Sequence, residues 1–451
     1  MNSKVLHVFE DGLVMRCAVP GDTEALVEFN ARVHSDRGWD SPDLGVGAWV
    51  RDLMTKPHPT FSVDDFLVVE DPDTGEIVSS TNLIPQTWSY DRVEFGVGRP
   101  ELVGTHPDYR RRGLVRAQFD VLHRWSAARG HKVQVITGIP YYYRQFGYEM
   151  GLNLHGGRRG PAAYVPSLGE GKAESYTVRP AQVDDLDFVA ECVSEGHKRQ
   201  PINCIRDSAL WRYQLEVQSS ESAPAVIMSL IETAPLDDAP GGKPVGFLAH
   251  GVVRWGRSLA VISYELKPGV SWWAVTPPVL RYLKAQGEAR ACYYDAPDAP
   301  AFDTLLFSLG AEHPSYSVVA EWLPKVDDPY AWFVRVDDIP DFLRTIAPAL
   351  EVRLASSVMV GHTGELTLSF YRSGVKLSFE QGRLAAVEPW MPSGDEGMGR
   401  FPDLTFLQLL FGYRSLSELD MAYADCFATL EGRLLLNAIF PKQASEIWCV
   451  A

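Results

Sequence analysis

The sequence has few cysteines, and none of them are closely paired. Among its 451 residues there are six, and no two form a CxxC motif or another metal-ligand spacing. Disulfide-framed secreted domains and structural zinc sites both need such spacing. We therefore expect reduced thiols, no metal site and a cytoplasmic location. The six are Cys17, Cys192, Cys204, Cys292, Cys426 and Cys449.

Long apolar runs and a surplus of basic residues are missing as well. No run approaches the roughly 18 apolar residues of a membrane-spanning helix, and residues 1–12 lack the pattern of a signal peptide. Lys and Arg number 42 against 58 Asp and Glu, which gives a net charge of -16. Because such a surface repels phosphate, we expect neither a membrane nor a nucleic-acid partner. The charge would attract cationic ligands, although it also serves solubility alone.

The composition is that of a globular protein with several domains. Apolar residues make up 46% and charged residues 22%, and the length corresponds to roughly three domains of about 150 residues. The first region alternates strand and helix signals, as expected for an α/β fold. We expect strands at 13–18, 66–70, 77 onward, 100–105 and 133–137, and helices after Asp22 and over 113–128.

The second region repeats features of the first. Arg16-x-Ala18 followed by Asp22 is matched 163 residues later by Arg179-x-Ala181 followed by Asp185. Near the other end, the four residues 146–149 match 309–312 at the same offset. One offset at both ends indicates a duplicated domain. Glycine and proline between 156 and 174 indicate a linker between the copies.

A third, smaller α/β region begins after a boundary near Pro324 to Pro329. Residues 365–370 and 375–379 alternate apolar and polar side chains around Ser373-Gly374, which predicts a β-hairpin. Residues 404–410 are expected to form a short helix, followed by a strand-like tail. The predicted domains are 1–160, 174–325 and 330–451.

The chemically informative segment runs from Val103 to Arg116. A strand leads into a loop with three arginines and then into the start of a helix. Free N–H groups at a helix start, aided by the helix dipole, form an anion site. Gly113 lets the backbone approach a phosphate, and the arginines can bind that phosphate from outside. A solvated basic turn is the alternative.

This loop resembles the acetyl-CoA loop of the GCN5-related N-acetyltransferases (GNAT), whose pattern is Arg/Gln-x-x-Gly-x-Gly/Ala. Arg110 and Gly113 fit the pattern, whereas Val115 departs from it. A second cluster, residues 137–148, contains the Tyr-x-x-Phe-Gly-Tyr segment that follows the splayed strand in this superfamily. The chain is most similar to the enhanced-intracellular-survival (Eis-type) acetyltransferases. That resemblance implies two tandem GNAT-like mixed-sheet domains, the second degenerate, and a smaller sterol-carrier-like α/β domain.

The resemblance also implies a cofactor site for acetyl-CoA. Backbone groups of Val103, Gly104 and Thr105 would contact the pantetheine and the acetyl carbonyl, and stabilise the oxyanion. Gly138 and Ile139 would line the other side of the cofactor. The pyrophosphate would lie against the loop and the helix start, formed by Arg110, Arg111, Arg112, Gly113, Leu114, Val115 and Arg116.

Two catalytic groups are implied in the same way. Tyr143 would be the general acid that protonates the departing CoA thiolate, since a phenol with a pKa of about 10 carries its proton at neutral pH. The terminal carboxylate of Ala451 would accept the amine proton, although family members often end in an aromatic residue. The alternatives are aromatic packing for Tyr143 and a frayed tail for Ala451.

The second copy lacks this chemistry at the offset of 163 residues. Tyr143 corresponds to Leu306, and residues 110–113 correspond to 273–276, without a basic, glycine-bearing loop. We therefore expect the second copy to be a scaffold that shapes the substrate cleft.

Four other polar side chains are candidate functional residues. Cys449 could be a nucleophile but has no obvious His or Asp partner nearby in the sequence. His106 adjoins the cofactor loop, where a structural or solvent-facing role is expected. Glu94 and Glu101 could supply an alternative base or a cation-binding wall, or lie exposed to solvent.

The sequence therefore predicts an acetyl-CoA-dependent N-acetyltransferase. Acetyl would pass to an amine of a small cationic acceptor by direct attack in a ternary complex. Aminoglycosides, polyamines, lysine side chains and peptides all fit that description. The resemblance implies a homo-oligomer, specifically a hexamer. A non-catalytic acyl-CoA or lipid-binding protein and an acyltransferase that uses longer acyl-CoA remain as alternatives.

Overall fold

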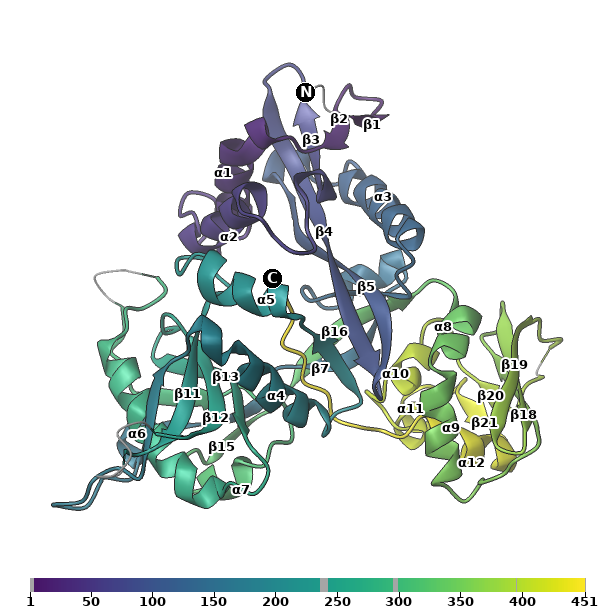
Figure 1. The fold of residues 1–451 in the computed structure, drawn as a ribbon. Helices are drawn as coiled ribbons and strands as arrows, with labels where there is room; N and C mark the ends of the chain where they lie inside the picture. The colour runs from purple at the N-terminus through teal and green to yellow at the C-terminus, as the bar shows by residue number, and fades with distance from the viewer. Residues whose placement is uncertain (1–3, 236–241, 295–298, 395, 451) are drawn as a thin grey trace.

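Three mixed β-sheets, each covered by helices, form the structure and confirm the predicted α/β class. The structure is a computed structural model that describes residues 4–235, 242–294, 299–394 and 396–450. Each sheet is the centre of one of three lobes (Figure 1). In the described part of the chain, no helix is both long and apolar enough to cross a membrane.

The first sheet has nine strands and lies between helices α1 (Thr23–Val33) and α2 (Leu44–Thr55) on one face and α3 (Leu114–Ala128) on the other. Along one strand, Phe66 and Val68 pack with α1 and α2, whereas Leu67 and Val69 pack with α3. That strand is apolar throughout because both of its faces are covered. The order is β1 (Val5–Val8), β2 (Val14–Cys17), β3 (Phe66–Asp71), β4 (Glu76–Tyr90), β5 (Val93–Thr105), β6 (Val133–Ile136), β16 (Tyr330–Val336) and β7 (Glu149–Leu154), with β10 (Ile202–Ile205) also pairing with β4.

The second sheet has seven strands and repeats this plan. Helix α4 (Leu186–His197) packs on one face, and α6 (Trp272–Ala289) packs on the other. The short helices α5 (Ser208–Arg212) and α7 (Tyr316–Val319) and a π-helix at Tyr213–Val217 complete this lobe. The order is β9 (Tyr176–Pro180), β11 (Val226–Thr233), β12 (Pro244–Gly251), β13 (Ser258–Leu266), β14 (Thr304–Phe307), β8 (Gly157–Pro161) and β15 (Lys325–Asp327).

The predicted repeat corresponds to the same ionic cluster in both copies. Arg16 donates to both carboxylate oxygens of Asp22, at 2.7 and 2.8 Å, and its Nε donates to Glu70 at 2.8 Å. Arg179 donates to Asp185 at 2.6 and 2.9 Å, and its Nε donates to a second carboxylate, Glu232, at 2.9 Å. Each cluster ties a strand, β2 in the first copy and β9 in the second, to the start of the helix that follows it, α1 or α4. The repeated residues therefore have a structural role.

The two copies exchange strands. Strand β16 follows β15 in the chain but pairs with β6 and β7 of the first sheet, and β8 follows β7 but pairs with β14 and β15 of the second sheet. The prediction of a linker over 156–174 is therefore wrong for residues 157–161, which form β8. A Cβ on Gly157 would lie 1.8 Å from the carbonyl oxygen of Phe307, and one on Gly160 would lie 2.2 Å from that of Trp322. These glycines allow close strand packing, and they are not markers of a flexible connection.

The third sheet has five strands and is covered by the helices of the same C-terminal region, which lie between residues 339 and 439. The predicted hairpin is confirmed as β17 (Gly364–Ser369) and β18 (Gly374–Glu380), and the predicted short helix as α10 (Phe406–Leu410). The other strands are β19 (Arg383–Trp390), β20 (Gly399–Arg400) and β21 (Phe427–Ala428), and the other helices are α8 (Ile339–Thr345), α9 (Ala347–Ala355), α11 (Leu416–Ala422) and α12 (Leu430–Ile439).

The C-terminal tail, residues 441–450, runs from the third lobe to a position between the other two (Figure 1). The prediction of a strand there is wrong, because the tail binds side chains of other elements instead of a strand edge. Asn153 and Ser445 bind each other in both directions, at 2.8 and 3.3 Å. The Trp448 ring stacks on Phe247 of β12 with 6.3 Å between ring centroids.

Candidate functional site

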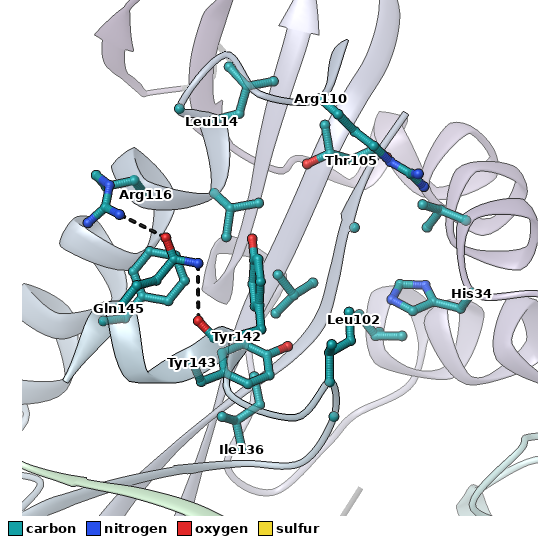
Figure 2. A pocket seen from close by; sticks show the side chains of 18 of the residues that line it. His34, Leu102, Thr105, Arg110, Leu114, Arg116, Ile136, Tyr142, Tyr143 and Gln145 are labelled. Atoms are coloured by element: carbon teal, nitrogen blue, oxygen red, sulfur yellow. Dashed lines mark hydrogen bonds between the residues drawn. The ribbon is translucent and has the colours of Figure 1, made fainter. Parts of the chain in front are cut away.

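Strands β5 and β6 separate beyond a short parallel contact and open a cleft. They pair only at Val97 with Val133 and at Gly98 with Gln134, although β5 continues to Thr105. The cleft has a volume of about 860 Å³. Every predicted cofactor residue and the predicted acid line it, namely Val103, Gly104, Thr105, Arg110, Arg111, Arg112, Gly113, Leu114, Val115, Arg116, Gly138, Ile139 and Tyr143 (Figure 2).

The start of α3 forms one end of the cleft. Gly113 is the N-cap with a left-handed φ of +80°, which turns the chain from the loop into the helix. The first turn of α3 carries no acidic residue, so its free N–H groups and the helix dipole can attract an anion. Arg110, Arg111 and Arg112 are exposed around it. This end of the cleft can therefore bind a phosphate group.

A β-bulge in β5 forms the middle of the cleft. Ser80 pairs with Gly104 but Asn82 pairs with Glu101, so β5 has one extra residue here, and Leu102 has a φ of +52°. A bulge leaves backbone polar groups outside the strand ladder. Gly104 is required because a Cβ would lie 2.6 Å from a methyl group of Val33 in α1.

Tyr143 forms the opposite wall, in the 3-10 helix Tyr142–Phe146. Its side chain is 6% exposed, and its ring packs near Phe119 and Phe333. A Cβ on Gly138 would lie 3.1 Å from a ring carbon of Tyr143, which is closer than ordinary contact, so the glycine leaves room for the phenol ring. Burial, and then the nearby Glu101 carboxylate and Tyr142, raise the pKa of Tyr143, which keeps its proton at neutral pH.

The three adjacent tyrosines therefore have different environments. Tyr141 is 68% exposed, whereas Tyr142 lies at the cleft and accepts a backbone hydrogen bond from Gln145 at 3.1 Å. Gln145 in turn accepts from Arg116 at 2.8 Å (Figure 2). Of the three, Tyr143 is the one buried in the cleft wall.

The other candidate residues, two glutamates and one histidine, lie in different environments. Glu101 lines the cleft and forms an ion pair with Arg99, whereas Glu94 is exposed and is not among the lining residues. His106 accepts from the Asp108 N–H at 3.2 Å, and its ring packs 4.4 Å from Trp39. The His106 geometry is that of a structural residue.

Sequence reasoning missed two cleft residues of α1 and its end, Val33 and His34. Burial lowers the pKa of His34, so its imidazole is neutral at neutral pH. The ring Nδ1–H donates to the Asn30 carbonyl at 3.2 Å. No local pattern marks these residues, because they lie about 70 residues before the arginine loop in the chain.

A second, smaller cavity lies where the tail meets the two copies. This central cavity, of about 290 Å³, shares Thr137 with the cleft between β5 and β6. The Val450 carbonyl accepts from Gln86 at 2.8 Å and from Arg99 at 2.7 Å. Ala451 lies outside the described residues. The central cavity is lined by residues that include Arg99, Thr137, Arg206, Trp255, Trp332 and Cys449.

The second copy differs from the alignment at an offset of 163 residues. Residues 273–276 lie in the first turn of α6, not in a loop, and Leu306 lies in β14, the counterpart of β6. The loop before α6 is residues 267–271 and contains Gly269, whose φ is +85°. Between β14 and Gly310 there are two residues, against ten between β6 and Gly147. The segment that holds Tyr143 in the first copy is thus much shorter in the second.

Among the residues that the structure describes, no group of three or more His, Cys, Asp and Glu side chains could hold a metal ion.

Comparison with known sequences identifies the first copy. Residues 35–151 match the acetyltransferase (GNAT) domain family. That range contains the bulged strand, the arginine loop, α3 and the Tyr143 segment. A comparison with curated proteins gives no match.

Comparison with solved structures concerns the fold of the whole chain. A GCN5-related N-acetyltransferase from Kribbella flavida has 18% identity and a TM-score of 0.62, covering 96% of this chain and 97% of its own. One from Anabaena variabilis has 14% identity and a TM-score of 0.62, with coverages of 96% and 99%. Eis1 from Mycobacterium abscessus has 12% identity and a TM-score of 0.56, with coverages of 99% and 98%. Residues 35–151 are therefore an acetyltransferase (GNAT) domain, and the whole chain shares the fold of solved structures that include two GCN5-related N-acetyltransferases and Eis1.

Proposed function

We propose that the protein transfers acetyl from acetyl-CoA to an amine of a small cationic acceptor, by direct attack in a ternary complex. The observation that carries this proposal is the cleft between β5 and β6. It has an anion-binding helix start at one end and a buried phenol on the opposite wall. That arrangement suits a long cofactor with phosphates at one end and a thioester at the other.

The cofactor would lie along the cleft with its pyrophosphate at α3. The N–H groups after Gly113 and the side chains of Arg110, Arg111, Arg112 and Arg116 would bind the phosphates. Pantetheine would follow the bulge at Val103 to Thr105, with Gly138 and Ile139 on its other side. The lining by all of these residues supports this placement.

The acceptor amine would attack the thioester carbonyl after losing a proton. An alkyl ammonium has a pKa of about 10, so a base must take that proton. Backbone N–H groups near Val103 to Thr105 would stabilise the oxyanion. As the carbon–sulfur bond breaks, Tyr143 would donate its proton to the thiolate. The Ala451 carboxylate is the proposed base, and Glu101, which lines the cleft, is the second candidate.

Aromatic and acidic side chains around Trp255, a residue of the central-cavity lining, support a cationic acceptor. Trp255 lines this cavity, is 47% exposed and stacks on Tyr293 with 4.0 Å between ring centroids. Tyr293 donates to Asp43 at 2.6 Å, and Tyr294 donates to Asp36 at 3.4 Å. Aromatic faces beside carboxylates attract cations. Of the two arginines that line this cavity, Arg99 forms an ion pair with Glu101, and Arg206 donates to the Cys449 carbonyl.

Thermal unfolding with and without acetyl-CoA tests the cofactor site. Ligand at 100 times its Kd adds about 2.7 kcal/mol, which raises the midpoint by roughly a few degrees. We expect that shift for the wild type and for Arg124→Ala, an exposed arginine of α3 outside the cleft lining. We expect a much smaller shift for the double variant Arg111→Ala/Arg112→Ala. No shift in the wild type at millimolar acetyl-CoA would contradict the proposal.

Release of free CoA thiol in the presence of amines then tests transfer. Turnover with a diamine or an aminoglycoside supports the proposed acceptor. Tight acetyl-CoA binding without release favours the non-catalytic acyl-CoA or lipid-binding alternative, and faster release from longer acyl-CoA favours the third alternative. Light scattering tests the proposed homo-oligomer, for which a hexamer is expected.

A further inference from the structure

An arginine without a carboxylate partner lies beside the central cavity. Arg206 follows β10, and its guanidinium lies 5.1 Å from the centre of the Trp211 ring in α5 and 4.3 Å from that of the Trp448 ring in the tail. One of its nitrogens donates to the Cys449 carbonyl at 2.9 Å. Among the residues that the structure describes, the Arg206 side chain makes no other hydrogen bond and no ion pair. This guanidinium therefore lacks the anion that usually accompanies a cation removed from bulk water.

A glutamate of the C-terminal tail is unpaired in the same cavity. Glu446 is the one carboxylate in the described lining of the central cavity. Its side chain makes no hydrogen bond and no ion pair in the part of the chain that the structure describes, and its Oε2 atom is buried. Burial raises the pKa of Glu446 well above the usual value, and a cation bound beside it would lower that pKa again. The cavity thus presents one unpaired cation and one unpaired acid.

The other arginines of this region are paired. Arg99, which also lines the central cavity, forms an ion pair with Glu101. In an adjoining cavity of about 60 Å³, which shares lining residues with the central cavity, Arg199 forms an ion pair with Glu265 at 2.5 Å. The lack of a carboxylate partner is therefore particular to Arg206.

The central cavity has the size and the position for a small molecule next to the reacting end of the cleft. Its volume of about 290 Å³ is close to the lower end of the range of roughly 300–1,000 Å³ that ligand pockets have. It shares Thr137 with the cleft between β5 and β6, and the next residue, Gly138, lies against the Tyr143 ring. A ligand in the cavity can therefore extend an amine past Thr137 toward Tyr143.

We propose that the acceptor is a basic α-amino acid, held by its α-carboxylate at Arg206 and by its α-ammonium at Glu446. Arg206 uses one N–H on the Cys449 carbonyl, which leaves others for a carboxylate, the partner that a guanidinium binds with two parallel hydrogen bonds. The side-chain amine of the acceptor lies toward Thr137 and is the group that is acetylated. Such a zwitterion pairs both groups that have no partner within the described chain, and its side chain keeps the acceptor cationic.

This inference rests on the proposed acetyl transfer and names its acceptor. The side-chain ammonium loses one proton to the base, and its nitrogen attacks the thioester carbonyl. The C–N bond forms, the C–S bond breaks, and the thiolate takes a proton from Tyr143. The phenolate regains the proton that the nitrogen loses as the amide forms. In the balance, acetyl moves from sulfur to nitrogen, CoA leaves as the thiol, and one proton is released.

Calorimetric titration of the full-length protein with two matched probes tests the site without turnover. L-Lysine carries the α-carboxylate, whereas cadaverine is the same chain without it. In the presence of CoA, we expect L-lysine to bind about 10–100-fold more tightly than cadaverine, the range that charge-assisted hydrogen bonds give. Equal affinity, tighter binding of cadaverine, or no binding of L-lysine at millimolar concentration would overturn the proposal.

Three variants locate the two contacts. Arg206→Gln should weaken L-lysine binding by about 10–100-fold without weakening cadaverine binding, and Arg206→Lys should restore part of the loss. Glu446→Gln should weaken the binding of L-lysine but not that of Nα-acetyl-L-lysine, which has no α-ammonium. Each variant should keep the wild-type thermal shift with acetyl-CoA, which reports an intact cofactor site. Unchanged L-lysine affinity in Arg206→Gln or in Glu446→Gln would contradict the assignment of that contact.

An exposed arginine of the same helix provides the matched control. Arg212 lies in α5, its side chain is 60% exposed, and it is not among the residues that line the central cavity. Arg212→Ala removes the same charge nearby and should bind L-lysine like the wild type. A loss equal to that of Arg206→Gln would show that general positive charge, and not the Arg206 contact, attracts the amino acid.

Release of CoA thiol separates this inference from the proposed function. We expect kcat/KM to be higher for L-lysine than for cadaverine, with the difference in KM, because the carboxylate contact is the same before and during transfer. If diamines are acetylated and L-lysine is not, the acceptor class is wrong and the proposed transfer stands. If L-lysine binds through Arg206 but no amine is acetylated, the proposed transfer is wrong, and the site is one that binds an amino acid without acetylating it.

Discussion

The two copies share a frame but differ in the space beside their central strands. In the first copy the separation of β5 and β6 leaves a cleft of about 860 Å³. In the second copy the corresponding strand β13 carries Tyr264, whose ring packs near Trp272 and His313 at 5.0 and 6.2 Å. Tyr264 also bonds Thr276 of α6 at 3.0 Å. Aromatic side chains thus pack beside the central strand of the second copy, whereas the first copy has an open cleft beside the corresponding strand.

The difference shows which sequence signals report fold and which report function. The Arg16 and Arg179 clusters recur in both copies with the same geometry, so a repeated motif here marks the frame. The arginine loop and the ten residues before Gly147 occur in one copy, so these segments mark the site. A duplicated chain therefore offers an internal control for each functional hypothesis.

The largest expected effect separates the tyrosines of the two copies. Tyr143→Phe removes the proposed proton donor, and loss of general acid catalysis is expected to lower turnover by about 10²–10⁴-fold. Acetyl-CoA should still stabilise the variant. Tyr264→Phe loses its hydrogen bond to Thr276 and should cost about 1 kcal/mol of unfolding free energy. Its turnover per folded molecule should stay unchanged. Thiol release measures turnover, and urea unfolding measures the unfolding free energy. Equal turnover of the two variants would show that Tyr143 is not the proton donor.

That comparison also shows what the sequence can reveal. The arginine loop and the Tyr143 segment are each continuous in the chain, so residues 103–116 and 137–148 can be recognised as local sequence patterns. No local pattern predicts the exchange of β8 and β16, because each of these strands pairs with the sheet of the other copy, far away in the chain. The glycines of β8 therefore gave the wrong prediction. Likewise, the position of His34 in the cleft and the hydrogen bond from Gln86 to the Val450 carbonyl depend on contacts between distant segments, which no local pattern predicts.

The next effect compares the two ionic clusters. The Arg16 side chain is 13% exposed and binds two carboxylates, so Arg16→Ala should cost about 1–3 kcal/mol. Arg179 binds the equivalent pair but is 37% exposed, so Arg179→Ala should cost no more than about 1 kcal/mol. Urea unfolding of the two variants gives both values. A larger loss for Arg179→Ala would show that burial does not set the strength of these clusters.

A smaller effect separates the two glycines that precede the long helices. Gly113 and Gly269 both have positive φ, +80° and +85°, with open space where a Cβ would lie. Alanine at either position should therefore cost about 1 kcal/mol from backbone strain alone. Only Gly113→Ala should also weaken acetyl-CoA binding, which calorimetric titration measures. If Gly269→Ala weakened binding equally, the loop of the first copy would not be a specific cofactor site.

The smallest effect is the acid dependence of the same ionic clusters. Burial alone would raise the pKa of Asp22, but hydrogen bonds from Arg16 and the Val19 N–H outweigh it and lower that pKa. Arg179 lowers the pKa of Asp185. Because the folded values lie below the unfolded value of about 3.9, the stabilisation is complete above that value and is lost as pH falls through the folded pKa. The free-energy difference between wild type and Arg16→Ala should therefore shrink from pH 6 to pH 3. The difference for Arg179→Ala should shrink less, since its solvent-exposed pair contributes less at the start.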